Sequence, residues 1–308
     1  MHTKQDFLSL ADLTAEELTD LLALAVRLKQ EWSAGGNQPV LKNKTLGMVF
    51  TKPSLRTRVS FEVGMQHLGG YALYIAPDEI QLGKRESVAD VARVLSRYVD
   101  GIMARVFAHA DVVTLARYSR VPVINGLSDF THPCQGLADL LTIMERKGGV
   151  RGRTIAYVGD ANNVANSLVF GGALLGAHVR IGAPEGYQLQ PEAAQRGAAL
   201  AAQHGGSLIQ VVDPRAAADG ADVIYTDVWT SMGQESEAAQ RAKVFPPYQV
   251  NSALMALAAG DAIVMHCLPA HRGHEITDEV ADSPQSALWD QAENRMHAQK
   301  AILVKLMA

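Results

Sequence analysis

One stretch organises the chain: the apolar run Thr45-Leu-Gly-Met-Val-Phe50, then Lys52-Pro53-Ser54-Leu55-Arg56-Thr57-Arg58, then the helix-like segment Val59–Leu68. The apolar run predicts a buried strand, the proline a turn, and Ser54 the N-cap of a helix. The first turn of a helix exposes unpaired N–H groups and the positive end of the dipole, so arginines there are unfavourable for stability. A bound dianion removes that conflict, because amides, hydroxyls and a guanidinium fork together suit a phosphate. The stretch predicts a phosphate site, with a helix that merely starts with basic residues as the alternative.

Length and composition set the class of protein. The chain has 308 residues, of which 48% are hydrophobic and 19% charged, with a net charge of -4. That length suggests two domains, and a slightly acidic chain gives no reason to expect nucleic acid. Two cysteines are too few for a disulfide scaffold, and no signal-like N-terminus, membrane-length apolar run or zinc-like cluster is found. We therefore expect a soluble cytoplasmic protein with a small anionic ligand, no metal and no membrane partner.

Strand-like and helix-like segments alternate through both halves of the chain. Predicted strands include Gly101–Arg105, 121–125, Thr154–Val158 and Ser207–Val211; Pro191–His204 is a predicted helix, and 77–86 a predicted polar loop. The glycine-rich stretch Gly148-Gly-Val-Arg-Gly152 follows a completed alternation and is the best candidate for a domain junction. Alternation on both sides predicts an α/β protein with two parallel-sheet, Rossmann-like domains. A final stretch, Gln285–Leu306, reads as one long helix.

Polar residues follow the predicted strands, where parallel sheets bind their ligands. Each position has an ordinary explanation by itself, such as a hydrogen-bonded loop histidine or an arginine paired with a carboxylate. Together they predict a phosphate site, carbonyl-polarising donors and an acid–thiol pair. The positions are Ser54–Arg58, Arg105, His132–Gln135, Asn163, Asp227–Met232 and His266–Pro269.

A second kind of site is suggested by Gly159-Asp-Ala-Asn-Asn-Val164, which follows a predicted strand as a dinucleotide fingerprint does. The spacing G-x-G-x-x-G is missing, and asparagines occupy places where small residues would admit a pyrophosphate. An NAD-dependent oxidoreductase, or a Rossmann-like binding protein without catalysis, is therefore kept as the alternative class.

Four motifs carry a family resemblance: Ser54-Leu-Arg-Thr-Arg58, His132-Pro-Cys-Gln135, Asp227-Val-Trp-Thr-Ser-Met-Gly233 and His266-Cys-Leu-Pro269. They resemble the signature set of the aspartate/ornithine carbamoyltransferase superfamily, in its order and spacing, and the last two point to the ornithine branch. The resemblance implies transfer of the carbamoyl group of carbamoyl phosphate to the δ-amine of ornithine, giving citrulline and phosphate, without a cofactor. It also implies a place in arginine metabolism, with arginine biosynthesis and arginine breakdown both open.

For carbamoyl phosphate, the resemblance implies that the first helix turn holds the phosphate, that Thr57, Arg105 and His132 face the carbamoyl oxygen, and that Gln135 holds its NH₂. Leu55 departs from the threonine of many members and is expected to contribute its backbone amide. Arg295 implies that the C-terminal helix, 286–308, packs on an N-terminal domain of residues 1–148, leaving 149–285 to bind ornithine. The implied contacts are Ser54, Leu55, Arg56, Thr57, Gln81, Arg105, His132, Pro133, Cys134, Gln135, Cys267, Leu268 and Arg295.

For ornithine, the implied contacts are Asn163, Asp227, Ser231 and Met232, and the implied catalytic residues are Arg105, His132, Asp227 and Cys267. Without the resemblance, Cys267 reads as a small buried hydrophobe and Asp227 as a loop cap. An acylated-ornithine or putrescine carbamoyltransferase is the main competitor, and the intact loop from Asp227 favours a free α-amino acid.

The loop Gln81-Leu-Gly-Lys-Arg-Glu86 has two interpretations. A charged loop is usually only solvated. The resemblance instead implies a homotrimer, or a larger assembly of trimers, in which Gln81 contacts carbamoyl phosphate of the neighbouring subunit. Lys84 is then a structural or gating residue.

Overall fold

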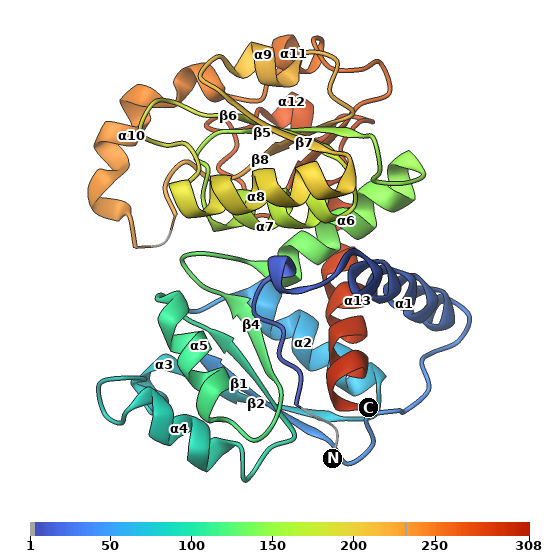
Figure 1. The fold of residues 1–308 in the computed structure, drawn as a ribbon, viewed down its shortest axis with the longest axis vertical. Helices are drawn as coiled ribbons and strands as arrows, with labels where there is room; N and C mark the ends of the chain where they lie inside the picture. The colour runs from blue at the N-terminus through green and yellow to red at the C-terminus, as the bar shows by residue number, and fades with distance from the viewer. Residues whose placement is uncertain (1–3, 232) are drawn as a thin grey trace. The chain divides into compact units, whose positions relative to one another are not determined.

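The computed structural model describes residues 4–231 and 233–308, and the chain forms two compact units (Figure 1). The first unit comprises Met1–Ala138 with Arg295–Ala308, and the second comprises Asp139–Asn294. The divisions fall inside two helices, α6 (Pro133–Lys147) and α13 (Leu288–Met307). The functional boundaries expected at residues 148 and 286 remain a prediction.

The sheet of the first unit is parallel throughout, with strand order β2-β1-β3-β4. Its strands are β1 (Thr45–Phe50), β2 (Tyr71–Ile75), β3 (Gly101–Arg105) and β4 (Val123–Leu127). β3 and β4 are buried along their whole length, and β1 is buried from its second residue on, while the edge strand β2 is partly exposed. Strands covered on both faces read as continuous apolar runs, which explains why the first and third strands were clear in the sequence.

Helices precede and connect these strands. They are α1 (Ala15–Ser33), α2 (Leu55–His67), α3 (Pro77–Ile80), α4 (Val88–Leu95) and α5 (His109–Tyr118), with a short 3₁₀ turn, η1 (Leu10–Asp12), before α1. The capping box that opens α1 is present: the Glu17 N–H donates to Thr14 Oγ1 at 3.1 Å, and the Thr14 N–H donates to Glu17 Oε2 at 2.8 Å. Residues 77–80, predicted as loop, form α3, because proline at the first position and Glu79 bonding back to the Ala76 N–H start a helical turn.

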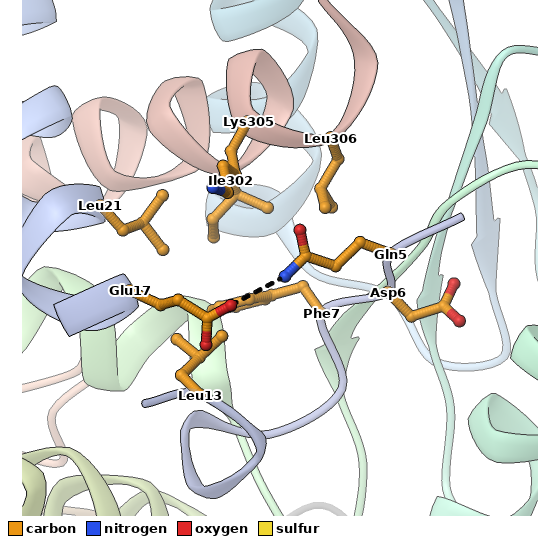
Figure 2. A pocket seen from close by; sticks show the side chains of 9 residues that line it. All are labelled: Gln5, Asp6, Phe7, Leu13, Glu17, Leu21, Ile302, Lys305 and Leu306. Carbon is orange, nitrogen blue, oxygen red and sulfur yellow. Dashed lines mark hydrogen bonds between the residues drawn. The ribbon is translucent and has the colours of Figure 1, made fainter. Parts of the chain in front are cut away.

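The C-terminal part of α13 packs within the first unit, as predicted. Figure 2 shows Ile302, Lys305 and Leu306 of α13 facing Leu21 of α1 and the N-terminal segment. The same segment is tied to α1 by a hydrogen bond of 3.4 Å from Gln5 Nε2 to Glu17 Oε1. This packing explains why the last helix carries buried apolar residues, such as Ile302 and Leu303, although it is remote in sequence from α1.

The sheet of the second unit is also parallel, with strand order β7-β6-β5-β8-β9. Its strands are β5 (Thr154–Val158), β6 (His178–Gly182), β7 (Ser207–Val211), β8 (Val223–Thr226) and β9 (Ile263–His266). Its helices are α7 (Asn163–Leu174), α8 (Pro191–His204), α9 (Pro214–Ala218), α10 (Ala238–Val244), α11 (Ser252–Met255) and α12 (Asp278–Ala281), with 3₁₀ turns η2 (Glu235–Glu237) and η3 (Pro246–Tyr248). In Figure 1, α7 and α8 lie on one side of this sheet and α9 and α11 on the other. Two parallel-sheet α/β units confirm the predicted fold class.

Each sheet has one place where the strand order reverses. In the first it lies between β1 and β3, where Phe50 pairs with Arg105, and in the second between β5 and β8. Loops leave such neighbouring strands in opposite directions, which opens a crevice at their carboxyl ends. Of the predicted site residues, Ser54 follows β1 and Arg105 ends β3, whereas Asn163 follows β5 and Asp227 follows β8.

Candidate active site

The first turn of α2 has the geometry expected for a phosphate cradle. Ser54 is the N-cap: its Oγ accepts the Thr57 N–H at 3.3 Å and donates to Thr57 Oγ1 at 3.1 Å. Thr57 is buried, whereas the Leu55 side chain is 74% exposed. Leu55 therefore points away from the cap, and only its backbone N–H is available at the helix N-terminus.

The two arginines of the motif differ in their partners. Arg58 Nε bonds Glu62 Oε1 at 2.9 Å, and the guanidinium lies over the Tyr74 ring, 4.1 Å from its centroid. The Arg56 side chain is half-buried, and among the residues that the structure describes it forms no hydrogen bond or ion pair. Arg56 is thus the guanidinium left for an anion, while Arg58 stabilises the helix surface.

Two further predicted residues, Arg105 and His132, are buried in the same unit. Arg105 is the last residue of β3, and His132 directly precedes α6. Burial, together with the positive charges of Arg295, Arg105 and Lys52, holds the pKa of His132 well below its usual value. His132 is therefore neutral near pH 7, and a neutral imidazole still has one N–H to donate.

Arg295 joins residues that are far apart in the sequence. Its Nη1 donates to Gln135 Oε1 at 2.6 Å, and its Nη2 donates to Thr57 Oγ1 at 3.4 Å. All three side chains are buried. The structure thus connects the cradle, α6 and α13 within the first unit; we call Ser54, Arg56, Thr57, Arg105, His132, Gln135 and Arg295 the anion cluster.

Lys52 belongs beside the anion cluster and was missed by sequence reasoning. The residue is 7% exposed, and its Nζ lies 4.6 Å from the centroid of the Phe107 ring. Burial and the charge of Arg105 lower the pKa of Lys52 to about 8, against a smaller opposing effect of Asp129. In the described part of the chain it makes no hydrogen bond or ion pair. The sequence signal was its place in the basic motif, two residues before the N-cap.

Three other residues predicted to contact the anion, Pro133, Cys134 and Gln81, differ in their setting. Pro133 and Cys134 open α6, and the Cys134 thiol donates to the Asn125 carbonyl at 3.4 Å. Burial raises the pKa of Cys134 to about 12, so this thiol is not a nucleophile. Gln81 is exposed after α3, and its amide donates to the Asp78 carbonyl at 3.4 Å, not to the anion cluster.

The second unit holds a separate polar cluster around Asp227. Asn162 Nδ2 donates to Asp227 Oδ2 at 2.7 Å, and Cys267 Sγ donates to Asp227 Oδ1 at 3.1 Å. The Val228 N–H also donates to Oδ1, at 2.8 Å. The predicted acid–thiol pair is therefore in contact; we call Asn162, Asp227 and Cys267 the acid–thiol cluster.

Asn162 was not among the predicted site residues, although the stretch that contains it was noted. Its Oδ1 caps α7 by accepting the N–H groups of Val164 at 2.9 Å and Ala165 at 3.4 Å. These are the amides that a dinucleotide pyrophosphate would need, so the cap argues against the NAD alternative. Asn163, which follows Asn162 in the sequence, and Ser231, four residues after Asp227, are both half-buried. Met232 lies outside the described residues.

The end of β9 supplies a further polar group. The His266 Nδ1 accepts the Leu268 N–H at 2.8 Å, and its Nε2 lies 3.1 Å from Glu275 Oε1. Ligand atoms of Asp227, His266 and Cys267 lie within 4.8 Å of one another, as in a metal site. Both ring nitrogens of His266 are already engaged, however, so a metal would have to displace one of these bonds. Leu268 has φ 58°, a left-handed conformation that is uncommon for leucine.

Comparison with known proteins shows which family the chain belongs to. Residues 5–145 match the family description "Aspartate/ornithine carbamoyltransferase, carbamoyl-P binding domain", and residues 151–306 match its "Asp/Orn binding domain". Ornithine carbamoyltransferase of Thermococcus kodakarensis is 56% identical over 303 residues, covering 98% of this chain and 96% of that protein. The anabolic ornithine carbamoyltransferase of Pyrococcus furiosus matches over the same shares, also at 56% identity.

Solved structures agree. An ornithine carbamoyltransferase structure from Pyrococcus furiosus has a TM-score of 0.97 at 55% identity, covering 99% of this chain and 97% of that one. The enzyme from Giardia lamblia, at 36% identity, has a TM-score of 0.89 with 99% and 98% coverage. The chain belongs to the aspartate/ornithine carbamoyltransferase family.

Proposed function

We propose that this chain transfers the carbamoyl group of carbamoyl phosphate to the δ-amine of L-ornithine, giving L-citrulline and phosphate. The observation that carries the proposal is the acid–thiol cluster, in which Asp227 is held by Asn162, Cys267 and the Val228 N–H. Relatives between 52% and 56% identical over nearly the whole chain are named ornithine carbamoyltransferase, which supports ornithine as the acceptor.

The donor binds the anion cluster. The phosphate dianion binds at the N-terminus of α2, where Ser54, the Leu55 N–H, Arg56 and Thr57 contact it. The helix dipole and the charge of Arg56 both favour an anion there. Lys52 adds positive charge from the same loop. Residues 1–148 with 286–308 form the proposed donor domain, and Pro133, Cys134, Cys267 and the Leu268 backbone complete the contacts assigned by resemblance.

The carbamoyl group is activated by hydrogen bonds to its oxygen. Thr57, Arg105 and the neutral His132 donate to that oxygen as attack makes it negative, and fixed donors around developing charge lower the barrier. Gln135 binds the carbamoyl NH₂. Arg295 holds Gln135 and Thr57 in place through the two bonds that it makes to them.

The acceptor binds the proposed ornithine domain, residues 149–285. Asn163, Asp227, Ser231 and Met232 receive its α-amino and α-carboxylate groups, and Asp227 with Cys267 lies beside the reacting amine. An alkyl amine has a pKa near 10 and attacks only when neutral, so the site must favour loss of its proton. The neutral amine adds to the carbamoyl carbon, the tetrahedral intermediate expels phosphate, and phosphate accepts the amine proton. None of these steps calls for a metal or an organic cofactor.

The oligomeric state, the metabolic pathway and the cellular compartment are also part of the proposal. A homotrimer with shared sites is supported by the family resemblance and by the exposure of Gln81 at the surface of the first unit. Arginine biosynthesis is supported by a relative named as the anabolic enzyme. Both cysteines are unpaired, which suits a reducing cytoplasm. No helix in the described residues is long and apolar enough to cross a membrane.

A citrulline assay tests the proposal. Purified protein is given millimolar carbamoyl phosphate with L-ornithine, with N-acetylornithine or with putrescine. We expect citrulline formation with ornithine and little product with the other two amines. The reason is that Asp227 and the loop to Ser231 are proposed to bind the free α-amino and α-carboxylate groups. Faster turnover of putrescine or acetylornithine would contradict the choice of acceptor, and no carbamoylation of any amine would contradict the reaction.

A further inference from the structure

Arg241 of α10 is an arginine buried beneath the loop that follows Asp227. It is 4% exposed, which is unusual for arginine unless the charge is paired. Its Nη1 donates to Asp160 Oδ2 at 2.8 Å and to the Trp229 carbonyl at 2.7 Å, and its Nε donates to Glu237 Oε2 at 2.9 Å. One guanidinium therefore ties together the turn after β5, the loop after β8 and the start of α10.

Two aromatic rings lie beside the same guanidinium. Its central carbon lies 4.9 Å from the centroid of the Tyr187 ring and 5.9 Å from that of Phe245. The Trp229 ring stacks on Phe245, with centroids 5.8 Å apart and an interplanar angle of 20°. Both the backbone and the side chain of Trp229 are thus held by the residues that surround Arg241.

Asp160 connects this network to the acid–thiol cluster. The Tyr157 hydroxyl donates to the Asp160 carbonyl at 2.9 Å and lies 3.3 Å from Asn162 Oδ1. Asn162 in turn donates to Asp227, at 2.7 Å. Arg241 therefore reaches Asp227 from one side through the turn after β5 and from the other side through Trp229.

The buried ion pair between Arg241 and Asp160 is not the most stabilising way to fill this part of the core. Burial raises the pKa of Asp160 to about 6, despite the opposing charge of Arg241. The ionised carboxylate is thus kept near pH 7 against a desolvation cost, and apolar residues often replace such pairs without loss of stability. A role other than fold stability accounts for it better.

We propose that Arg241 is a positioning residue for the acceptor amino acid, fixing residues 227–231 so that Asp227 and Ser231 meet ornithine in one arrangement. The inference rests on the proposed function and assigns it a residue that touches neither substrate. It predicts that Arg241 controls affinity for ornithine and leaves affinity for carbamoyl phosphate unchanged, because the anion cluster belongs to the other unit.

Steady-state kinetics of Arg241→Gln and Arg241→Lys test this, with Arg215→Gln as the matched control at an exposed arginine of the same unit. Arg241→Gln should raise the KM for ornithine about 10- to 100-fold, the range for losing charge-assisted hydrogen bonds, with the KM for carbamoyl phosphate within about twofold. Arg241→Lys keeps the charge but not the three-acceptor fork, so it should recover only part of the affinity. Arg215→Gln should match the wild type.

Hydrogen exchange of residues 227–235, measured without substrate, gives a reading independent of turnover. It should accelerate in Arg241→Gln while exchange in the strands of both sheets stays as in the wild type.

Should Arg241→Gln fail to fold, Asp160→Asn removes the same ion pair with an isosteric side chain and should likewise raise the ornithine KM. Unchanged ornithine KM and unchanged loop exchange in a folded variant, or equal increases of both KM values, would overturn the inference. A wild type that makes no citrulline contradicts the proposed function instead, and loop exchange then decides the positioning role alone.

Discussion

The Cys267 thiol and one amide N–H of Asn162 hold opposite oxygens of the Asp227 carboxylate, at 3.1 Å and 2.7 Å respectively. A carboxylate accepts hydrogen bonds only, so both neighbours orient it without taking its charge. Asn162 is itself fixed, because its carbonyl oxygen caps α7. Asp227 is therefore a negative group of fixed direction, suited to an ammonium group of the substrate.

Asp227→Ala should abolish most ornithine turnover, lowering kcat/KM by about 100-fold or more, because a charge-assisted contact to the substrate is lost and three donors are left without their acceptor. Carbamoyl-phosphate affinity should stay within about twofold of the wild type, since no residue of the anion cluster is altered. Calorimetric titration with carbamoyl phosphate and initial-rate kinetics with ornithine check the two halves of the prediction. Equal loss of both would show that the units do not divide the substrates as proposed.

Arg56 and Arg58 form a matched pair for testing the phosphate cradle. Arg56→Ala should weaken binding of inorganic phosphate and carbamoyl phosphate about 10- to 100-fold, as expected for one charge-assisted contact of roughly 1.5–3 kcal/mol. Arg58→Ala removes an exposed i,i+4 pair with Glu62, worth about 0.5 kcal/mol of folding stability, and should leave anion affinity nearly unchanged. Titration of both variants with phosphate gives the comparison, and similar losses in the two would contradict the assignment of Arg56.

Regular structure was predictable where pattern and local signals agree. The bounds Gly101–Arg105, Thr154–Val158, Pro191–His204 and Ser207–Val211 came directly from apolar runs, caps and glycine stops. The strand predicted at residues 121–125 begins and ends two residues later, because Pro122 precedes it and the pairing shifts register between Ala104 and Arg105. A proline has no N–H for a ladder, so the strand starts after it.

Partnerships between distant residues were not predictable from one sequence. Nothing local distinguishes Arg56 from Arg58; only the structure shows that Glu62 occupies the latter. The bond from Arg295 to Gln135 spans 160 positions, and that from Arg241 to Asp160 spans 81. The family resemblance named Arg295 and Gln135 as separate site residues without their bond, whereas Arg241 and Asp160 lie outside the predicted site and only the structure shows their contact.

Lys52 makes the donor affinity sensitive to pH. Its pKa of about 8 is below the ordinary value for lysine, so it loses its charge as the pH rises through about 8 in the free protein. A bound dianion favours the charged form, and the KM for carbamoyl phosphate should therefore rise above about pH 8 in the wild type. Lys52→Arg, which stays charged, should flatten that rise, and Lys52→Met should bind weakly at every pH.

The same residue should cost stability at neutral pH. Because folding lowers the pKa of Lys52, its contribution to the free energy of unfolding is unfavourable below about pH 8 and is relieved as the pH rises from there towards the unfolded value near 10.5. Lys52→Met is expected to raise the free energy of unfolding at pH 7 by about 2 kcal/mol. Urea unfolding at pH 7 and pH 10 checks this: the variant's advantage should shrink at the higher pH, and a variant less stable than the wild type at pH 7 would contradict it.

Gln81 gives the proposed shared site a test by complementation. In a cyclic trimer each site would combine the anion cluster of one subunit with Gln81 of the next, so variants that damage different halves can restore one another. Gln81→Ala and His132→Ala, each inactive alone, should on mixing after reversible dissociation regain up to about a quarter of wild-type activity, the random fraction of sites with both halves intact. Mixing His132→Ala with Arg105→Ala is the control and should regain nothing, because both changes lie in the same half. Recovery in the control, or none in the first mixture despite mixed trimers, would place Gln81 outside the neighbouring site.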